Sequence, residues 1–199
     1  MSLFDTLVKY GMPFVPKPIV GRIARRYVAG DTLDDAVCTL REINEEGAMG
    51  TVDVLGEEVR EPAKATTAVA EYLRLLDRIE DAKLDANISI NPTMHGLKID
   101  QALCEENLAA IAGRASELDS FVRIDMEDHT CTDGTIQLYR RMHENHGSTV
   151  GIVLQSYLHR TVADINDLLP LNPNIRICKG IYREPREIAW KDFETIRAN

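Results

Sequence analysis

The sequence predicts an α/β protein in which a helical segment precedes about five βα units of a (β/α)8 barrel. From Thr51 onward, short apolar runs alternate with amphipathic helical stretches. A polar residue stands at the end of every apolar run, namely Asp53, Asn91, Asp125, Gln155 and Lys179. An open doubly wound sheet begins in the same way, but it concentrates its signal in a first glycine-rich turn. Neither G-x-G-x-x-G nor a P-loop occurs in the sequence, which favours the barrel.

Two segments follow from this pattern, an N-terminal helical segment at residues 1–47 and a partial barrel domain at 48–199. In the first segment, Thr32 or Asp31 is the expected N-cap of a helix, and Gly47 is its expected stop. A closed barrel of this kind needs about 250 residues, whereas the chain has 199. We therefore expect the chain to be the front part of a longer protein.

The first two βα units are predicted from apolar spacing and from one proline. Residues 51–55 read as a strand, and Pro62 stands at a favourable first position of the helix that follows. A second strand is expected at 87–90 and a second helix at 99–115.

The third, fourth and fifth units are predicted in the same way. The third strand is expected at 121–126, with Thr130 or Thr132 as the N-cap of its helix. The fourth strand is expected at 149–155, followed by a short helix that contains Val162, Ile165 and Leu168. The fifth strand is expected to be buried at 175–178, with Pro185 opening the last helix.

Charge and cysteine content restrict the class of protein. The net charge of −9 argues against nucleic acid as the main partner. Residues 1–30 nevertheless carry +4, which leaves −13 for the remainder. This basic start suits either a solvated helix or contact with an anionic membrane surface. Four widely spaced cysteines without a C-x-x-C pair fit reduced thiols in the cytoplasm.

Arg176 and Lys179 are the most informative pair of residues, because a cation on a buried strand requires an anionic partner. Lys179, if desolvated beside Arg176, could lose its proton and form a Schiff base, as in barrel aldolases. Alternatively, both cations could stabilise an anionic cofactor such as a reduced flavin. The residues alone leave these two interpretations open.

The other strand ends carry weaker signals. Asp125 is expected to face inward and to pair with a cation on a neighbouring strand, whereas Glu127 and Asp128 suit a solvated loop end. Alternate strand residues point to opposite sides, so this cluster is not expected to bind a metal. Gln155 suits either an edge-on contact with a heteroaromatic ring or a satisfied position in the core.

Four motifs together resemble the proline dehydrogenases, in particular the bacterial single-function form. They are V-D-V-L-G-E-E at 52–58, R-I-D-M-E-D-H at 123–129, L-Q-S-Y-L-H-R-T at 154–161 and R-I-C-K-G-I-Y-R-E-P at 176–185. They occur in the family's order, each at a strand end, and the likeness covers nearly the whole chain.

The resemblance implies a distorted βα barrel that binds FAD noncovalently and oxidises L-proline to Δ1-pyrroline-5-carboxylate. It also implies that electrons pass to a quinone at the membrane, which makes a cytoplasmic protein with peripheral membrane association the expected location. Whether the protein forms oligomers is left open. By the same likeness, the catalytic residues are Asp125 and Arg176, the substrate-binding residues are Asn91, Tyr182 and Glu57, and the cofactor-binding residues are Met126, Gln155, Cys178, Lys179 and Gly180.

The sequence departs from the family in two places. Asn91 stands where the family commonly has a lysine that pairs with the active-site aspartate, so Asn91 is expected to hydrogen-bond Asp125 without a charge. The paired arginines that the family uses to hold the proline carboxylate belong to a later helix than any in this chain. A Schiff-base aldolase built on Lys179 and a catalytically inactive fragment are the alternatives. The inactive fragment, with its exposed sheet edges, predicts self-association.

Overall fold

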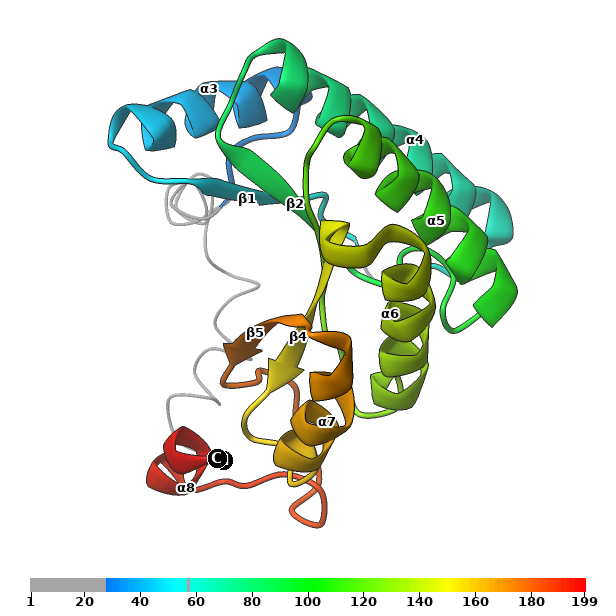
Figure 1. Ribbon diagram of the computed structural model, residues 1–199, viewed down its shortest axis with the longest axis vertical. Helices are drawn as coiled ribbons and strands as arrows, with labels where there is room; N and C mark the ends of the chain where they lie inside the picture. The colour runs from blue at the N-terminus through cyan, green and yellow to red at the C-terminus, as the bar shows by residue number, and fades with distance from the viewer. Residues whose placement is uncertain (1–27, 57) are drawn as a thin grey trace, which may run out of the picture.

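Five parallel strands form one sheet in a computed structural model that describes residues 28–56 and 58–199. Their order in the sheet is their order in the chain, β1-β2-β3-β4-β5, as Figure 1 shows in part. The strands are β1 (Gly50–Asp53), β2 (Ala86–Ile90), β3 (Val122–Ile124), β4 (Val150–Gln155) and β5 (Asn174–Cys178). Parallel neighbours require crossover connections. This sequential order is that of the first five units of a βα barrel.

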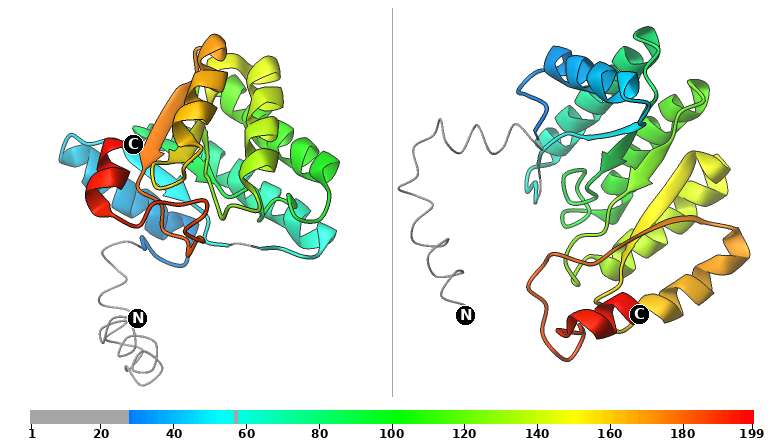
Figure 2. Two further views of the ribbon diagram at one scale, coloured as in Figure 1. Left: turned by 90° about the horizontal axis from the view of Figure 1, so that it is seen from below. Right: turned by 90° about the vertical axis from the view of Figure 1, so that its left-hand side faces the viewer.

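Helices occupy the crossovers and cover one side of the sheet (Figure 1). The covering helices are α4 (Pro62–Asp81), α5 (Gln101–Glu117), α6 (Thr132–His146) and α7 (Thr161–Leu168). Two short 3-10 helices, η2 (Gly147–Thr149) and η3 (Leu169–Leu171), lead into β4 and β5. The helix α3 (Leu33–Glu45) precedes β1, and α8 (Phe193–Ala198) closes the chain. Figure 2 shows the same layers from two further directions.

The core lies between the sheet and these helices. Ile90, Ile124 and Ile152 are paired across three neighbouring strands and are fully buried on the helical side. Because strand residues alternate between faces, the register places Ser89 beside Arg123, and Arg123 beside Gly151, on the opposite face. This second face is therefore polar, and it leads to the carboxyl ends of the strands.

The observed first turns of the helices confirm the predicted starts of α3 and α4 and correct the predicted N-cap of α6. Thr32 caps α3 with a capping box that includes Asp35, and Pro62 occupies the first turn of α4. The expected N-cap of α6 was wrong, because Cys131 holds that position without a side-chain hydrogen bond. Thr132 is already helical, and the Thr130 hydroxyl bonds Asp128 instead.

Two strand predictions are also corrected. The third strand ends at Ile124, so Asp125 and Met126 lie in the loop beyond it. The fifth strand is not buried, and Ile177 is 49% exposed. Among the described residues, β5 pairs only with β4, so it lies at the edge of the sheet.

The segment after β5 is irregular where a helix was expected. No helix begins at Pro185, and α8 starts only at Phe193, with Asp192 as its N-cap. The segment instead packs Ala189 and Ile196 against Tyr157 and Leu158, beyond the carboxyl end of β4.

Residues 1–27 were expected to be helical and either to be solvated or to contact a membrane. These residues lie outside the part of the chain that the structure describes, so both expectations stay predictions. None of the helices in the part that the structure describes combines the length and apolar character that crossing a bilayer requires.

Candidate active site

A cavity of about 380 Å³ opens where the strands end, and most of the predicted site residues line it. Val153 and Ile181 complete the lining. The predicted residues in the lining are Asn91, Asp125, Met126, Gln155, Arg176, Cys178, Gly180 and Tyr182. In parallel α/β folds, the carboxyl ends of the strands are where ligands bind.

Asp125 and Arg176, which both line this cavity, form an ion pair. The Arg176 Nη2 atom donates to Asp125 Oδ1 at 2.5 Å, and Ser89 Oγ donates to Asp125 Oδ2 at 2.6 Å. Arg176 also reaches Ser89 Oγ at 3.4 Å. The Asp125 side chain is 22% exposed and that of Arg176 is 43% exposed, so both remain accessible from the cavity. The expected pairing of Asp125 with a strand-borne cation is therefore present.

Asn91 does not hydrogen-bond Asp125, and this part of the sequence prediction was wrong. Its Nδ2 atom donates instead to Asp53 Oδ2 at 3.2 Å. Ser89 and Arg176 donate to the two oxygens of Asp125.

Ser89 and Asp53 belong to this network, although neither was assigned a role from the sequence. Ser89 could have been found from the period of two along β2, because Ser89 and Asn91 fall on the same face of the strand. Asp53 ends the adjacent strand, but its partner depends on the pairing of β1 with β2.

Gln155 is buried and carries one unused hydrogen-bonding atom. Its Nε2 atom donates to the carbonyl oxygen of Met126 at 3.1 Å. Its Oε1 atom is buried and has no partner among the described residues. Since an unsatisfied buried acceptor is costly, this atom fits a ligand that donates an N–H group.

Gly180 gives the cavity its shape beside β5. Its φ is +99°, and a Cβ atom at this position would lie 2.3 Å from the Tyr157 ring. Only glycine therefore fits here without displacing the aromatic ring. Cys178 is half-buried, and burial raises the pKa of its thiol.

Lys179 is exposed and is not part of the cavity lining. The Schiff-base alternative depended on desolvation of this lysine beside Arg176. The structure does not provide that desolvation, because the side chain at this edge of the sheet faces solvent. Arg176 is instead engaged by Asp125.

Lys98 links three of the loops that follow the strands. Lys98 Nζ lies 3.0 Å from Glu58 Oε1 and 2.9 Å from Asp128 Oδ2, and these two hydrogen bonds raise the pKa of Lys98. Burial opposes ionisation of Asp128, but bonds from Thr130 and Lys98 outweigh it and lower its pKa to about 2. Glu57, expected to help close the pocket, lies outside the described residues.

Glu127 is not a solvated loop residue, as the sequence pattern had suggested. It is 3% exposed and accepts a hydrogen bond from the Thr93 backbone N–H at 2.8 Å. A second buried carboxylate, Glu184, binds the ring of His129 and accepts from its backbone N–H at 2.9 Å. These contacts fix the loops that follow β2, β3 and β5 around the cavity.

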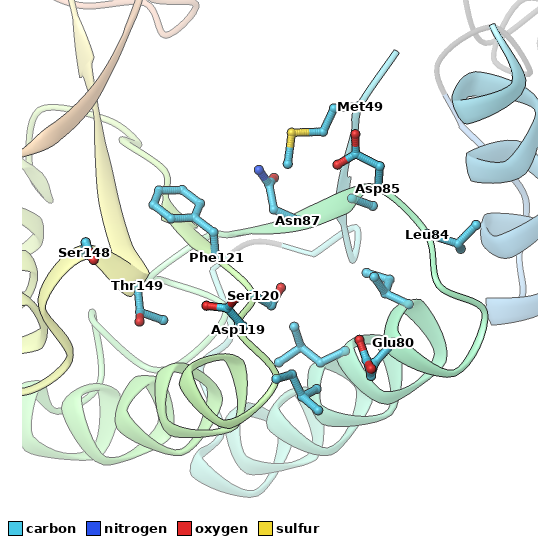
Figure 3. Close-up of a pocket in the computed structure, with 14 residues that line it drawn as sticks. Met49, Glu80, Leu84, Asp85, Asn87, Asp119, Ser120, Phe121, Ser148 and Thr149 are labelled. Carbon is cyan, nitrogen blue, oxygen red and sulfur yellow. The ribbon is translucent and has the colours of Figure 1, made fainter. Parts of the chain in front are cut away.

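A second cavity, of about 360 Å³, lies at the opposite end of the sheet (Figure 3). Met49, Asp85 and Phe121, which precede three of the strands, line it. The amino-terminal face of a barrel is where residues serve stability rather than chemistry. None of the predicted site residues that the structure describes contributes to it.

The sheet order and the cavity at the strand ends define the class: a βα-barrel protein with a cavity at its carboxyl face. The sequence profile described as proline dehydrogenase matches residues 36–182. The chain therefore belongs to the proline dehydrogenase family.

Curated relatives agree with this assignment. Proline dehydrogenase 1 of Bacillus subtilis subsp. natto is 36% identical over 169 residues, which are 85% of this chain and 56% of that protein. Proline dehydrogenase of Deinococcus radiodurans is 34% identical over 181 residues, which are 89% of this chain and 58% of that protein. The chain thus spans somewhat more than half the length of these relatives.

Solved structures show the same fold. Proline utilization A (PutA) from Bdellovibrio bacteriovorus matches with a TM-score of 0.72 at 19% identity, over 81% of this chain and 20% of that one. A PutA from Bradyrhizobium japonicum matches with a TM-score of 0.64 at 18% identity, over 80% of this chain and 19% of that one. The five described βα units are therefore those of a TIM-like barrel.

Proposed function

We propose that the protein is an FAD-dependent proline dehydrogenase that oxidises L-proline to Δ1-pyrroline-5-carboxylate. The observation that carries the proposal is the cavity at the strand ends. It combines the Asp125–Arg176 pair with the buried Oε1 atom of Gln155, which no residue in the described part of the chain meets with a hydrogen bond. Family membership supports the reaction, and these residues supply groups that a flavin and a cyclic amino acid require.

The residues present fit a flavin. Gln155 Oε1 is an acceptor for a ring N–H, and Gly180 lines the same cavity, with the Tyr157 ring packed against its backbone. Met126 and Cys178 line the same cavity. Arg176 cannot be deprotonated in a protein, so it contributes a fixed positive charge. Bound FAD supplies the acceptor for the two electrons that leave the substrate.

The proposed role of Asp125 is to hold Arg176 in place and to keep the polar framework of the cavity ordered. Ser89 supports it from β2 through a hydrogen bond. Tyr182 and Asn91 line the cavity and are proposed to contact the substrate. Glu57 is proposed, from the family likeness alone, to help close the pocket, and Lys179 to lie beside the cofactor.

Flavin absorbance tests this proposal in the product of the whole gene, including any residues encoded after Asn199. The purified protein is expected to be yellow and to lose its visible flavin band when L-proline is added without oxygen. D-proline serves as the control for the stereochemistry of the substrate. A protein that bound no flavin, or a flavin band unchanged by L-proline, would contradict the proposal.

A quinone is the proposed electron acceptor, and the proposed location is the cytoplasm, with peripheral contact at a membrane. The excess of +4 on residues 1–30 supports attraction to an anionic surface. Sedimentation with vesicles tests this, because vesicles containing anionic lipid should retain the protein at low salt and neutral vesicles should not. Equal binding to both would contradict membrane contact through charge.

A further inference from the structure

The segment that follows β5 forms one wall of the cavity, and it has no regular structure of its own. Gly180, Ile181 and Tyr182 line the cavity, and we call these three residues the 180–182 wall. From Lys179 to Asp192, all of which the structure describes, the chain forms one isolated β-bridge and no helix or strand. Contacts with the neighbouring loops must therefore hold this wall in place.

Glu184 is the buried carboxylate of this segment, two residues beyond Tyr182. Its Oε2 atom lies 2.5 Å from His129 Nδ1, and its Oε1 atom accepts from the His129 backbone N–H at 2.9 Å. Burial of a carboxylate is costly unless donors meet it, and His129 meets both of its oxygens. His129 belongs to the loop after β3, three residues beyond Met126, which lines the cavity. Glu184 thus ties the segment after β5 to the loop after β3.

Tyr157, in the loop after β4, connects the same carboxylate to the 180–182 wall. Its hydroxyl donates to Glu184 Oε1 at 3.5 Å. Burial and then the charge of Glu184 raise the pKa of Tyr157, and a hydrogen bond from the Tyr182 backbone offsets only part of this rise. The hydroxyl therefore stays protonated, donating to Glu184 and accepting from Tyr182. The Tyr157 ring packs against Gly180, where a Cβ atom would lie 2.3 Å from it. Both ends of the wall are thus in contact with Tyr157.

We propose that Glu184 is a positioning residue that fixes the 180–182 wall for substrate binding, through its bonds to His129 and Tyr157. Glu184 does not itself line the cavity, so it acts through these groups. The proposal rests on the proposed function, because it assumes that Tyr182 contacts the substrate. A wall that contacts the substrate alike in the ground state and the transition state contributes uniform binding. Its displacement raises KM and leaves kcat unchanged.

Steady-state kinetics of the whole gene product test this role, with kcat expressed per bound flavin so that unfolded or empty protein does not count. Glu184→Met keeps a side chain of similar length but removes both acceptor oxygens. Tyr157→Phe keeps the ring beside Gly180 and removes only the hydroxyl. Each variant is expected to raise KM for L-proline about tenfold, which corresponds to the loss of one hydrogen bond to a charged group. The value of kcat per flavin should change by less than about twofold.

A matched control and a double variant accompany these two proteins. Glu187→Met makes the same chemical change at an exposed position of the same segment and should keep KM unaltered. The double variant with Glu184→Met and Tyr157→Phe should raise KM no more than about threefold beyond either single variant, because both substitutions release one wall. Multiplied effects in the double variant would assign the two residues separate roles and overturn the inference.

The outcomes separate the two proposals. If L-proline did not reduce the flavin of the unsubstituted protein, the proposed function would fail and the inference with it. If the unsubstituted protein oxidised L-proline and the substitutions left KM unchanged, only the inference would fail. A purely structural role for Glu184 would lower the flavin content without changing KM of the loaded protein, which also overturns the inference. Because Tyr157→Phe removes a single oxygen atom, a failure of Glu184→Met to fold does not remove the test.

Discussion

Arg176 and Asp125 are 51 residues apart in the sequence, yet their side chains meet at 2.5 Å between Nη2 and Oδ1. Asp125 follows β3 and Arg176 lies on β5, so β4 separates the two strands in the sheet. The contact spans β4 because a long arginine side chain crosses over Val153, which also lines the cavity. This pair links the two strand ends on which the proposed chemistry depends.

Asp125→Asn tests the role of this pair. The substitution keeps the shape but removes the charge that holds Arg176, so kcat/KM for L-proline is expected to fall by about 10²-fold. The free energy of unfolding should change by less than about 1 kcal/mol, because Arg176 is 43% exposed and solvent screens the pair. Steady-state kinetics and urea unfolding measure the two effects. Asp167→Asn, which removes an exposed partner of Arg140, is the control and should leave kinetics unchanged.

Gly180→Ala tests the shape of the cavity. The backbone φ of +99° and the Tyr157 ring 2.3 Å from a built Cβ both oppose a side chain. We expect a loss of about 1–3 kcal/mol in the free energy of unfolding, together with a lower flavin content. Gly113→Ala in α5 is the control, because its nearest neighbour would lie 3.9 Å away and alanine favours helix. Equal stability of the two variants would contradict the assigned conformation of Gly180.

His95 predicts a specific dependence of stability on pH. It is fully buried, and burial lowers its pKa to about 4. A folded-state pKa below the unfolded value near 6.5 means that the unfolded chain takes up the proton first. The contribution of His95 is therefore complete above pH 6.5 and is lost as the pH falls toward 4.

Urea unfolding at pH 7.5 and pH 5 measures the effect of His95. The unsubstituted protein should lose about 2 kcal/mol more over this interval than His95→Leu, which has no group to titrate. Identical losses in the two proteins would show that His95 is accessible to protons in the folded state.

Lys98→Met tests the link between the loops at the rim. Loss of the bonds to Glu58 and Asp128 should increase amide hydrogen exchange in residues 54–60 without unfolding the core. The energetic effect should stay below about 1 kcal/mol and shrink at high salt, because the Lys98 side chain is 34% exposed. Lys83→Met, which removes a surface pair with Glu80, is the control. If exchange in residues 54–60 were unchanged, Lys98 would not restrain that loop.

The sequence predicted the βα alternation and most of the residues around the cavity. Strand positions follow from local apolar runs. A polar residue at the end of a strand lies at the carboxyl edge of a parallel sheet, whichever strands are its neighbours. This is why Asp125 and Gln155 could be named before the structure was known, whereas Arg176 was named as a cation within a predicted buried strand. Local patterns also located Pro62 and Thr32 at the starts of helices.

Hydrogen-bond partners could not be predicted in this way, because they depend on register between strands. Asn91 was expected to bond Asp125 but bonds Asp53, whereas Ser89 and Arg176 donate to Asp125. Glu127 looked like a loop residue, yet the chain buries it against Thr93. The exposure of β5 likewise depends on its position in the sheet rather than on its composition.

The sequence by itself determined the order of elements, the family motifs and the residue types at each strand end, because these depend on neighbours along the chain. Only the tertiary structure decided which of these groups meet. It paired Arg176 with Asp125, directed Asn91 to Asp53, left Lys179 in solvent and gave Gln155 Oε1 no partner within residues 28–56 and 58–199. The physical reason is that pairing of parallel strands sets distances between residues far apart in sequence, and those distances decide the hydrogen bonds and the burial.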